Sequence, residues 1–148
     1  MSASVLCDLL LLVFVTAAAV SDLIYRKIPN RLVLAGLLAA FCLHGWLAAP
    51  SWPWNSLGGM ATGFFLFLPL YLLRGMAAGD VKLIAMVGAF LGLPAALFTL
   101  ILGSLSGSII GYAYIKATGQ DAATYELPFG TFLGVSAIIV AFVGPLGI

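Results

Sequence analysis

Two aspartates are the residues of this chain best placed to do chemistry, because each lies at the end of a long apolar run beside a basic residue. Asp22 is followed by Arg26 and Lys27, and Asp80 is followed by Lys82. A carboxylate in a membrane segment costs roughly 2.5 to 3.5 kcal/mol on insertion scales, so its presence indicates a functional site. Two such groups on one membrane face predict a pair that acts together.

A pair of carboxylates has its own acid–base chemistry. When two of them come close, both do not ionise easily, so one keeps a proton and the pair titrates as a unit. One can then act as a base on a water molecule while the other acts as an acid toward a carbonyl or a leaving amine, as in aspartic proteases. A structural alternative stays open at this point: Asp22 would pair with Arg26, and Asp80 would cap a helix or pair with Lys82.

The composition is that of an integral membrane protein. Of the 148 residues, 64% are hydrophobic and 7% are charged, whereas a soluble domain carries about 25% charged residues. A net charge of +1 without a basic stripe excludes nucleic-acid binding. Cys7 and Cys42 have no thiol or histidine at metal-ligand spacing, so we expect buried, inert thiols and no metal site. His44 has no partner in sequence, and we expect it at the membrane interface.

Six segments are long and apolar enough to be drawn as membrane spans, which need about 20 residues each. The sequence therefore predicts an all-α polytopic membrane protein. The first run lacks a basic start and a cleavage site, so we expect a retained helix and no signal peptide. The approximate limits are Ser4–Val20, Leu32–Ala48, Leu57–Leu73, Gly75–Leu93, Ala95–Ile115 and Leu127–Pro145, and the loop Lys116–Glu126 separates the last two.

The basic residues predict the orientation, because they gather in cytoplasmic loops. With six spans, all of them fall on one side: Arg26, Lys27, Arg31, Arg74, Lys82 and Lys116. We therefore expect the N-terminus outside, the basic loops in the cytoplasm and both aspartates at the cytoplasmic face. Trp46, Trp52 and Trp54 would form a belt at the outer interface.

The length of the fourth segment predicts the depth of Asp80. A helix that began only after Lys82 would be roughly 16 Å long at 1.5 Å per residue, against about 30 Å of hydrocarbon. We therefore begin the segment at Gly75, which puts Asp80 about one and a half turns inside its edge.

Small residues predict where the helices pack closely. Glycines recur every four residues in two segments, and such ridges let backbones approach one another in a membrane. They are Gly59 and Gly63, then Gly103, Gly107 and Gly111. The segments show no convincing internal repeat, which disfavours a transporter built from inverted halves.

Three short motifs resemble those of a known family. Residues 75–83 read Gly-Met-Ala-Ala-Gly-Asp-Val-Lys-Leu, which resembles a Gly-x-Gly-Asp signature with Ala77 at the first glycine. Residues 22–30 run from an aspartate through basic residues to Ile-Pro-Asn, and residues 127–130 read Leu-Pro-Phe-Gly. In this order and on six spans, the motifs resemble the type IV prepilin peptidases, which are membrane aspartic proteases.

The resemblance implies a single membrane-embedded aspartic peptidase domain over residues 1–148, with Asp22 and Asp80 as the catalytic pair. It would cleave the basic leader from a prepilin at the cytoplasmic boundary of a bacterial or archaeal membrane, without metal or cofactor. The prepilin's apolar helix would lie in the bilayer, and the pilus assembly machinery would be a further partner. No insert with paired cysteines separates the first two spans, so the chain resembles the short branch that serves Flp or Tad pili, without methyltransferase activity.

Four further residues are implied to bind substrate or to shape the site. Gly79 would let the backbone bend at the aspartate, and Pro128 and Gly130 would shape an irregular start of the last helix. Lys82 would lie beside the site or set the topology.

Two other classes of function use the same residues differently. A proton- or ion-coupled carrier would employ both aspartates as a relay. A scaffold subunit of a secretion machine would need neither.

Overall fold

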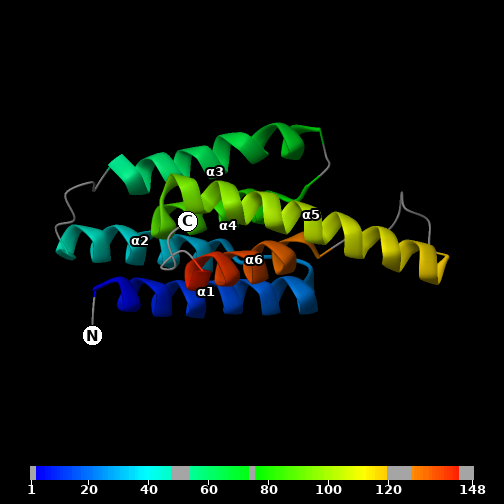
Figure 1. Ribbon diagram of the computed structural model, residues 1–148, viewed down its shortest axis with the longest axis horizontal. Helices are drawn as coiled ribbons and strands as arrows, with labels where there is room; N and C mark the ends of the chain where they lie inside the picture. Colours follow the sequence, from blue (N-terminus) through cyan, green and yellow to red (C-terminus); the bar gives the residue numbers. More distant parts are fainter. Residues whose placement is uncertain (1–2, 48–53, 74–75, 120–127, 144–148) are drawn as a thin grey trace.

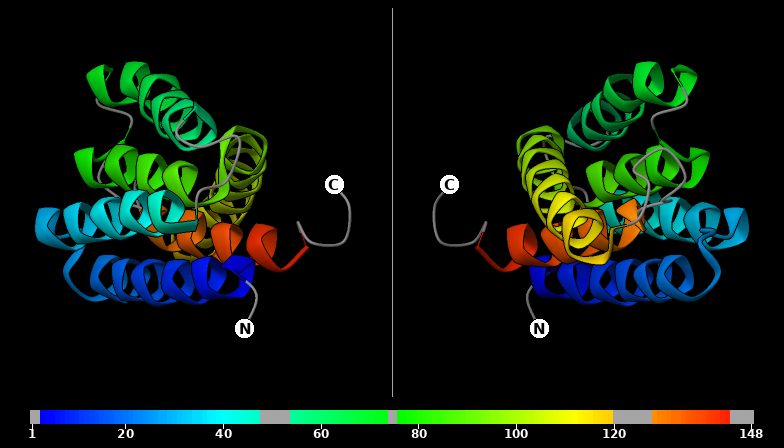
Figure 2. Two further views of the ribbon diagram at one scale, coloured as in Figure 1. Left: turned by 90° about the vertical axis from the view of Figure 1, so that its left-hand side faces the viewer. Right: turned by 90° about the vertical axis from the view of Figure 1, so that its right-hand side faces the viewer.

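The protein folds as a bundle of α-helices. The computed structural model describes residues 3–47, 54–73, 76–119 and 128–143. Successive helices run in opposite directions along the bundle (Figures 1 and 2). The all-α class predicted from the sequence is confirmed. The six helices of the described residues are α1 (Ala3–Tyr25), α2 (Asn30–Leu47), α3 (Trp54–Leu72), α4 (Ala78–Leu91), α5 (Leu93–Thr118) and α6 (Phe129–Val143).

Three of these helices are long and apolar enough to cross a membrane, namely α1 from Val5, α3 and α5. The helices α2 and α6 are apolar but shorter. Large apolar side chains such as Val13, Phe65 and Ile109 are exposed on the outside of the bundle. A soluble protein rarely exposes such continuous apolar surface, so this exterior fits lipid.

The helix α4 lies at the centre of the bundle and packs against all five other helices. Val81 and every residue from Leu83 to Phe90 are buried. We expected this segment to begin at Gly75, but Met76 and Ala77 are not helical, and the 14-residue helix begins at Ala78. Because α4 is surrounded by protein, the length that lipid contact demands of a spanning helix does not apply to it.

A single residue joins α4 to α5. Gly92 has φ +81°, and its backbone N–H donates to the Gly88 carbonyl at 2.8 Å. Such a φ favours glycine because it has no Cβ. Pro94 follows in the first turn of α5, where proline is well tolerated. The chain therefore reverses within one residue and returns α5 along the bundle.

The glycine ridges pack as predicted. A Cβ added to Gly63 of α3 would lie 2.8 Å from the backbone oxygen of Ile84 in α4. A Cβ on Gly103 of α5 would lie 2.7 Å from Leu133 of α6. Both helix pairs thus cross where only a hydrogen atom fits between them. Gly59, Gly107 and Gly111 are also buried.

Several smaller expectations need correction. The helix α1 continues past Val20 to Tyr25, so Asp22 lies inside its last turn. Cys7 is buried as expected, but Cys42 is exposed on the outer surface of α2. Arg74, Trp52 and most of the loop before α6 lie outside the described residues.

Candidate active site

Asp22 and Asp80 come together in space, from the last turn of α1 and the first turn of α4. Both side chains are buried, with 6% and 4% of their surface exposed. A Cβ added to Gly130 would lie 2.9 Å from Oδ1 of Asp80 and 3.0 Å from Oδ2 of Asp22. The two oxygen atoms therefore lie no farther apart than the sum of these distances, with Gly130 against both.

The first turn of α6 holds the two carboxylates. The Thr131 backbone N–H donates to Oδ2 of Asp22 at 3.0 Å, and its Oγ1 lies 3.4 Å from the same oxygen. The Gly130 backbone amide donates toward both carboxylates. The first N–H groups of a helix have no partner within the helix and carry partial positive charge, so they bind anions well. The start of α6 is thus a carboxylate-binding site.

Ile28 closes the space beside the aspartate pair. It belongs to the short connection between α1 and α2, and it is buried. A Cβ on Gly130 would lie 2.8 Å from Cδ1 of Ile28, and a Cβ on Gly79 would lie 3.1 Å from its Cβ. Arg26, which begins this connection, has φ +52°, an unusual value for a non-glycine residue. The two glycines therefore make room for one apolar side chain next to the carboxylates.

Comparison with known proteins identifies the family of this arrangement. The model of the type IV leader peptidase family matches residues 9–112, which include both aspartates. The chain belongs to the type IV leader peptidase family.

Related proteins from several bacteria share one name. The chain is 32% identical over 137 residues to the "Prepilin leader peptidase/N-methyltransferase" of Xanthomonas campestris pv. campestris, covering 88% of this chain and 47% of that protein. The protein of the same name from Legionella pneumophila is 38% identical, and the match covers 60% of this chain and 32% of that protein. The protein of the same name from Bacillus subtilis is 30% identical, and the match covers 85% of this chain and 51% of that protein. The chain thus spans about half the length of these relatives or less. No solved structure matches it significantly.

Ala77 occupies the position at which the resemblance to this leader peptidase family expects a glycine. Its backbone has φ −78° and ψ 149°, an extended conformation open to any L-residue. Alanine is therefore accommodated here without strain. Ala77 is also the N-cap of α4, and its backbone amide donates toward the Asp80 carboxylate. Asp80 thus caps its own helix in the manner of a capping box while it faces Asp22.

Gly79 has a different role from the one predicted. We expected it to bend the backbone, but it lies within the first turn of α4. Among the described glycines, only Gly92 and Gly119 have positive φ. What Gly79 provides is the space for Ile28, and this contact joins positions 51 residues apart in the sequence.

Lys82 lies away from the aspartate pair. Two residues along a helix amount to a rotation of about 200°, so Lys82 leaves α4 on the side opposite Asp80. Its Nζ donates to Oδ1 of Asn30 at 2.9 Å, and both residues line an apolar groove of about 610 Å³ bordered by α2, α3 and α4. Pro128 directly precedes α6, and its carbonyl accepts the Thr131 N–H at 3.1 Å. Of the four additional predicted residues, Gly79, Gly130 and Pro128 therefore adjoin the site, and Lys82 does not.

Sequence reasoning gave no site role to Ile28 and missed Thr131. Besides contacting Asp22, its hydroxyl lies 3.2 Å from the Ala19 carbonyl oxygen and ties α6 to α1. Its position directly after Pro-Phe-Gly, in the first turn of an apolar helix, was the available signal. No group of three or more His, Cys, Asp or Glu residues in the described part of the chain could hold a metal ion.

Proposed function

We propose that this chain is a membrane aspartic endopeptidase that removes the leader peptide of type IV prepilins of the Flp type, with Asp22 and Asp80 as its catalytic pair. The observation that carries the proposal is the convergence of both carboxylates on Gly130. Membership of the leader peptidase family and the names of the relatives support the substrate class.

The reaction follows from two carboxyl groups that share one proton. The ionised carboxylate takes a proton from a water molecule as the water oxygen bonds to the scissile carbonyl carbon, and the protonated partner gives its proton to the carbonyl oxygen. The resulting diol collapses with cleavage of the C–N bond: the protonated carboxyl group gives its proton to the leaving amine, and a diol hydroxyl returns a proton to the ionised carboxylate. Gly130 and Thr131 keep the carboxylates in position through their backbone amides.

Access to the pair requires movement, because both carboxylates are buried. Ile28 is the apolar side chain that fills the space beside them, and it lies on a short non-helical connection. The substrate backbone therefore takes the place that Ile28 occupies in the closed form. Gly79 and Gly130, which have no side chains, line that place on two sides.

The proposed setting is the cytoplasmic membrane of a bacterium or archaeon, with all six helices crossing, the N-terminus outside and residues 1–148 acting as one domain. The end of the bundle where α1 ends and α2, α4 and α6 begin, which we call the basic end, supports this orientation (Figure 1). It carries Arg26, Lys27 and Arg31, and Arg26 interacts electrostatically with Asp22. A basic leader held in the cytoplasm would then reach the pair from that side.

The test compares two catalytic variants with a control of the same charge change. Asp22→Asn and Asp80→Asn should each abolish leader removal from a co-expressed pilin in a gel-shift assay, a loss of at least about 10²- to 10⁴-fold. Asp121→Asn, in the polar segment between α5 and α6, should leave processing intact. Full processing by either catalytic variant would show that the two aspartates do not act as a catalytic pair. Ion flux in liposomes that both variants lose, without any proteolysis by the wild type, would favour a carrier.

We expect this chain to lack the N-methyltransferase activity that the names of the relatives include, because no insert with paired cysteines separates its first two helices. Incubation with a cleaved pilin and a methyl donor should leave its N-terminal mass unchanged.

A further inference from the structure

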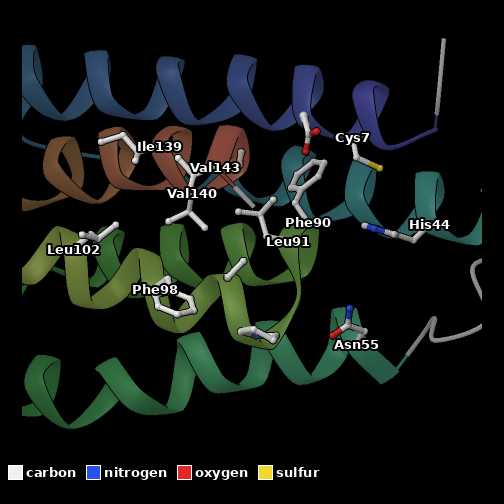
Figure 3. Close-up of a pocket in the computed structure, with 14 residues that line it drawn as sticks. Cys7, His44, Asn55, Phe90, Leu91, Phe98, Leu102, Ile139, Val140 and Val143 are labelled. Carbon is white, nitrogen blue, oxygen red and sulfur yellow. The ribbon is translucent and has the colours of Figure 1, made fainter. Parts of the chain in front are cut away.

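A second cavity lies at the end of the bundle opposite the aspartate pair. It has a volume of about 510 Å³, and all six helices contribute to its lining. We call it the distal cavity. In Figure 3, the apolar side chains of Phe98, Leu102 and Ile139 lie toward one side of it, and His44 and Asn55 toward the other. The distal cavity is thus amphiphilic along its length.

Asp8 of α1 lines this cavity and is the third carboxylate within an apolar run. It is half-buried, and within the described residues its carboxylate has no hydrogen-bond or ion-pair partner. The described lysine and arginine side chains belong to the basic end or to the far end of α5. A carboxylate among apolar residues is costly unless it is paired, so Asp8 calls for a cationic partner that the described residues do not supply.

The other polar groups at the cavity offer one hydrogen-bond acceptor, the neutral Nε2 of His44, and one donor, the amide of Asn55. His44 Nδ1 lies 2.9 Å from the Ala40 carbonyl oxygen, so this nitrogen carries the proton and Nε2 is left for another partner. Asn55 presents an amide beside Gly92. Helix ends of both kinds also meet here: Leu91 and Val143 end α4 and α6, and Asn55 lies in the first turn of α3. C-terminal turns favour cations and N-terminal turns favour anions.

We propose that the distal cavity binds a membrane phospholipid with a primary ammonium headgroup. The ammonium pairs with Asp8, the phosphate accepts a hydrogen bond from the Asn55 amide, and an acyl chain lies along Phe98, Leu102 and Ile139. A lipid is the occupant that matches an apolar cavity whose polar end carries one carboxylate without a partner among the described residues. This site is independent of the proposed peptidase reaction.

The test measures which lipid the purified full-length chain retains. After removal of native lipid, the protein is mixed with equal amounts of three phospholipids that have the same acyl chains and ethanolamine, choline or glycerol headgroups. Native mass spectrometry should find the ethanolamine lipid retained over the glycerol lipid by at least about tenfold, the size expected for one charge-assisted hydrogen bond. The choline lipid should fall between them, because it keeps the positive charge but has no N–H to donate.

Three variants separate the ionic contact from the cavity itself. Asp8→Asn should reduce the preference for ethanolamine to within about twofold, whereas Asp121→Asn should keep it. Ala95→Trp, which fills the cavity and leaves Asp8 in place, should abolish retention of all three lipids. It tests the proposal independently if Asp8→Asn does not fold. Equal retention of ethanolamine and glycerol lipids by the wild type would overturn the proposal. So would an unchanged preference in Asp8→Asn, or a wild-type protein that retains no lipid.

Discussion

The two ends of the bundle surround aspartate side chains in different ways. At the basic end, Asp22 and Asp80 are enclosed beneath Ile28 and receive backbone N–H groups from α6. At the distal end, Asp8 faces an open cavity and has no partner among the described residues. The neighbours of a carboxylate in this bundle thus decide whether it is enclosed by donors of the protein or left open to a cavity.

Helix direction explains much of this difference. The helices α4 and α6 both begin at the basic end, so their free N–H groups point at Asp80 and Asp22. Both helices end at the distal cavity, where their last carbonyl groups repel a carboxylate and attract a cation. The starts of α4 and α6 thus meet the two carboxyl groups at the basic end, whereas helix ends and helix starts both contribute to the distal cavity.

The largest effect after loss of an aspartate is expected from Gly130→Ala. The added Cβ would lie within 3.0 Å of an oxygen of each carboxylate and 2.8 Å from Ile28, so all three groups must shift. A displacement of about 1 Å in a catalytic site can cost roughly a hundredfold in rate. We expect a loss of that size in kcat/KM for leader cleavage.

Gly134→Ala is the matched control, one turn farther along α6. Its Cβ would lie 3.1 Å from the Cβ of Ala19 and would touch neither carboxylate. It should lower stability slightly and change kcat/KM by less than about threefold. Equal losses in the two variants, measured with purified enzyme and a synthetic prepilin segment, would show that helix packing and not the aspartate pair explains the effect.

A smaller effect is expected from Thr131→Val. Valine keeps the shape and the backbone N–H but removes the hydroxyl that lies near Asp22 and the Ala19 carbonyl. The loss of one hydrogen bond predicts a decrease in kcat of about three- to tenfold with little change in KM.

Thr131→Ser restores the hydroxyl and should recover most of the activity. A serine variant as slow as the valine variant would rule out the positioning role. An increase in KM alone would place Thr131 at the substrate instead.

The sequence predicted the features that depend on neighbouring residues. Apolar length and composition predicted the six helical segments, and the motifs predicted that Asp22 and Asp80 belong together. The contact of Thr131 with Asp22 joins positions 109 residues apart, and no local pattern contains it. The central burial of α4 could not be predicted from the sequence either, because a helix inside a bundle and a helix facing lipid have similar hydropathy. Asp8 was overlooked although the rule that selected the other two aspartates applies to it.

The smallest effect concerns Thr99, which tests whether a polar group without a partner always marks a ligand site. Its Oγ1 is buried without a hydrogen-bond partner in the described structure, and unlike Asp8 it does not line the distal cavity. Replacing an unpaired hydroxyl with a methyl group of the same shape removes a buried polar atom at no cost in packing. Thr99→Val should therefore be neutral or stabilising by up to about 1 kcal/mol in thermal unfolding and should leave lipid retention unchanged.

Thr118→Val, on the same helix, loses an exposed hydrogen bond of 2.8 Å to the Tyr114 carbonyl and should change stability by less than about 0.5 kcal/mol. Clear destabilisation by Thr99→Val alone would mean that this hydroxyl has a buried hydrogen-bond partner, as the carboxylates of the aspartate pair do.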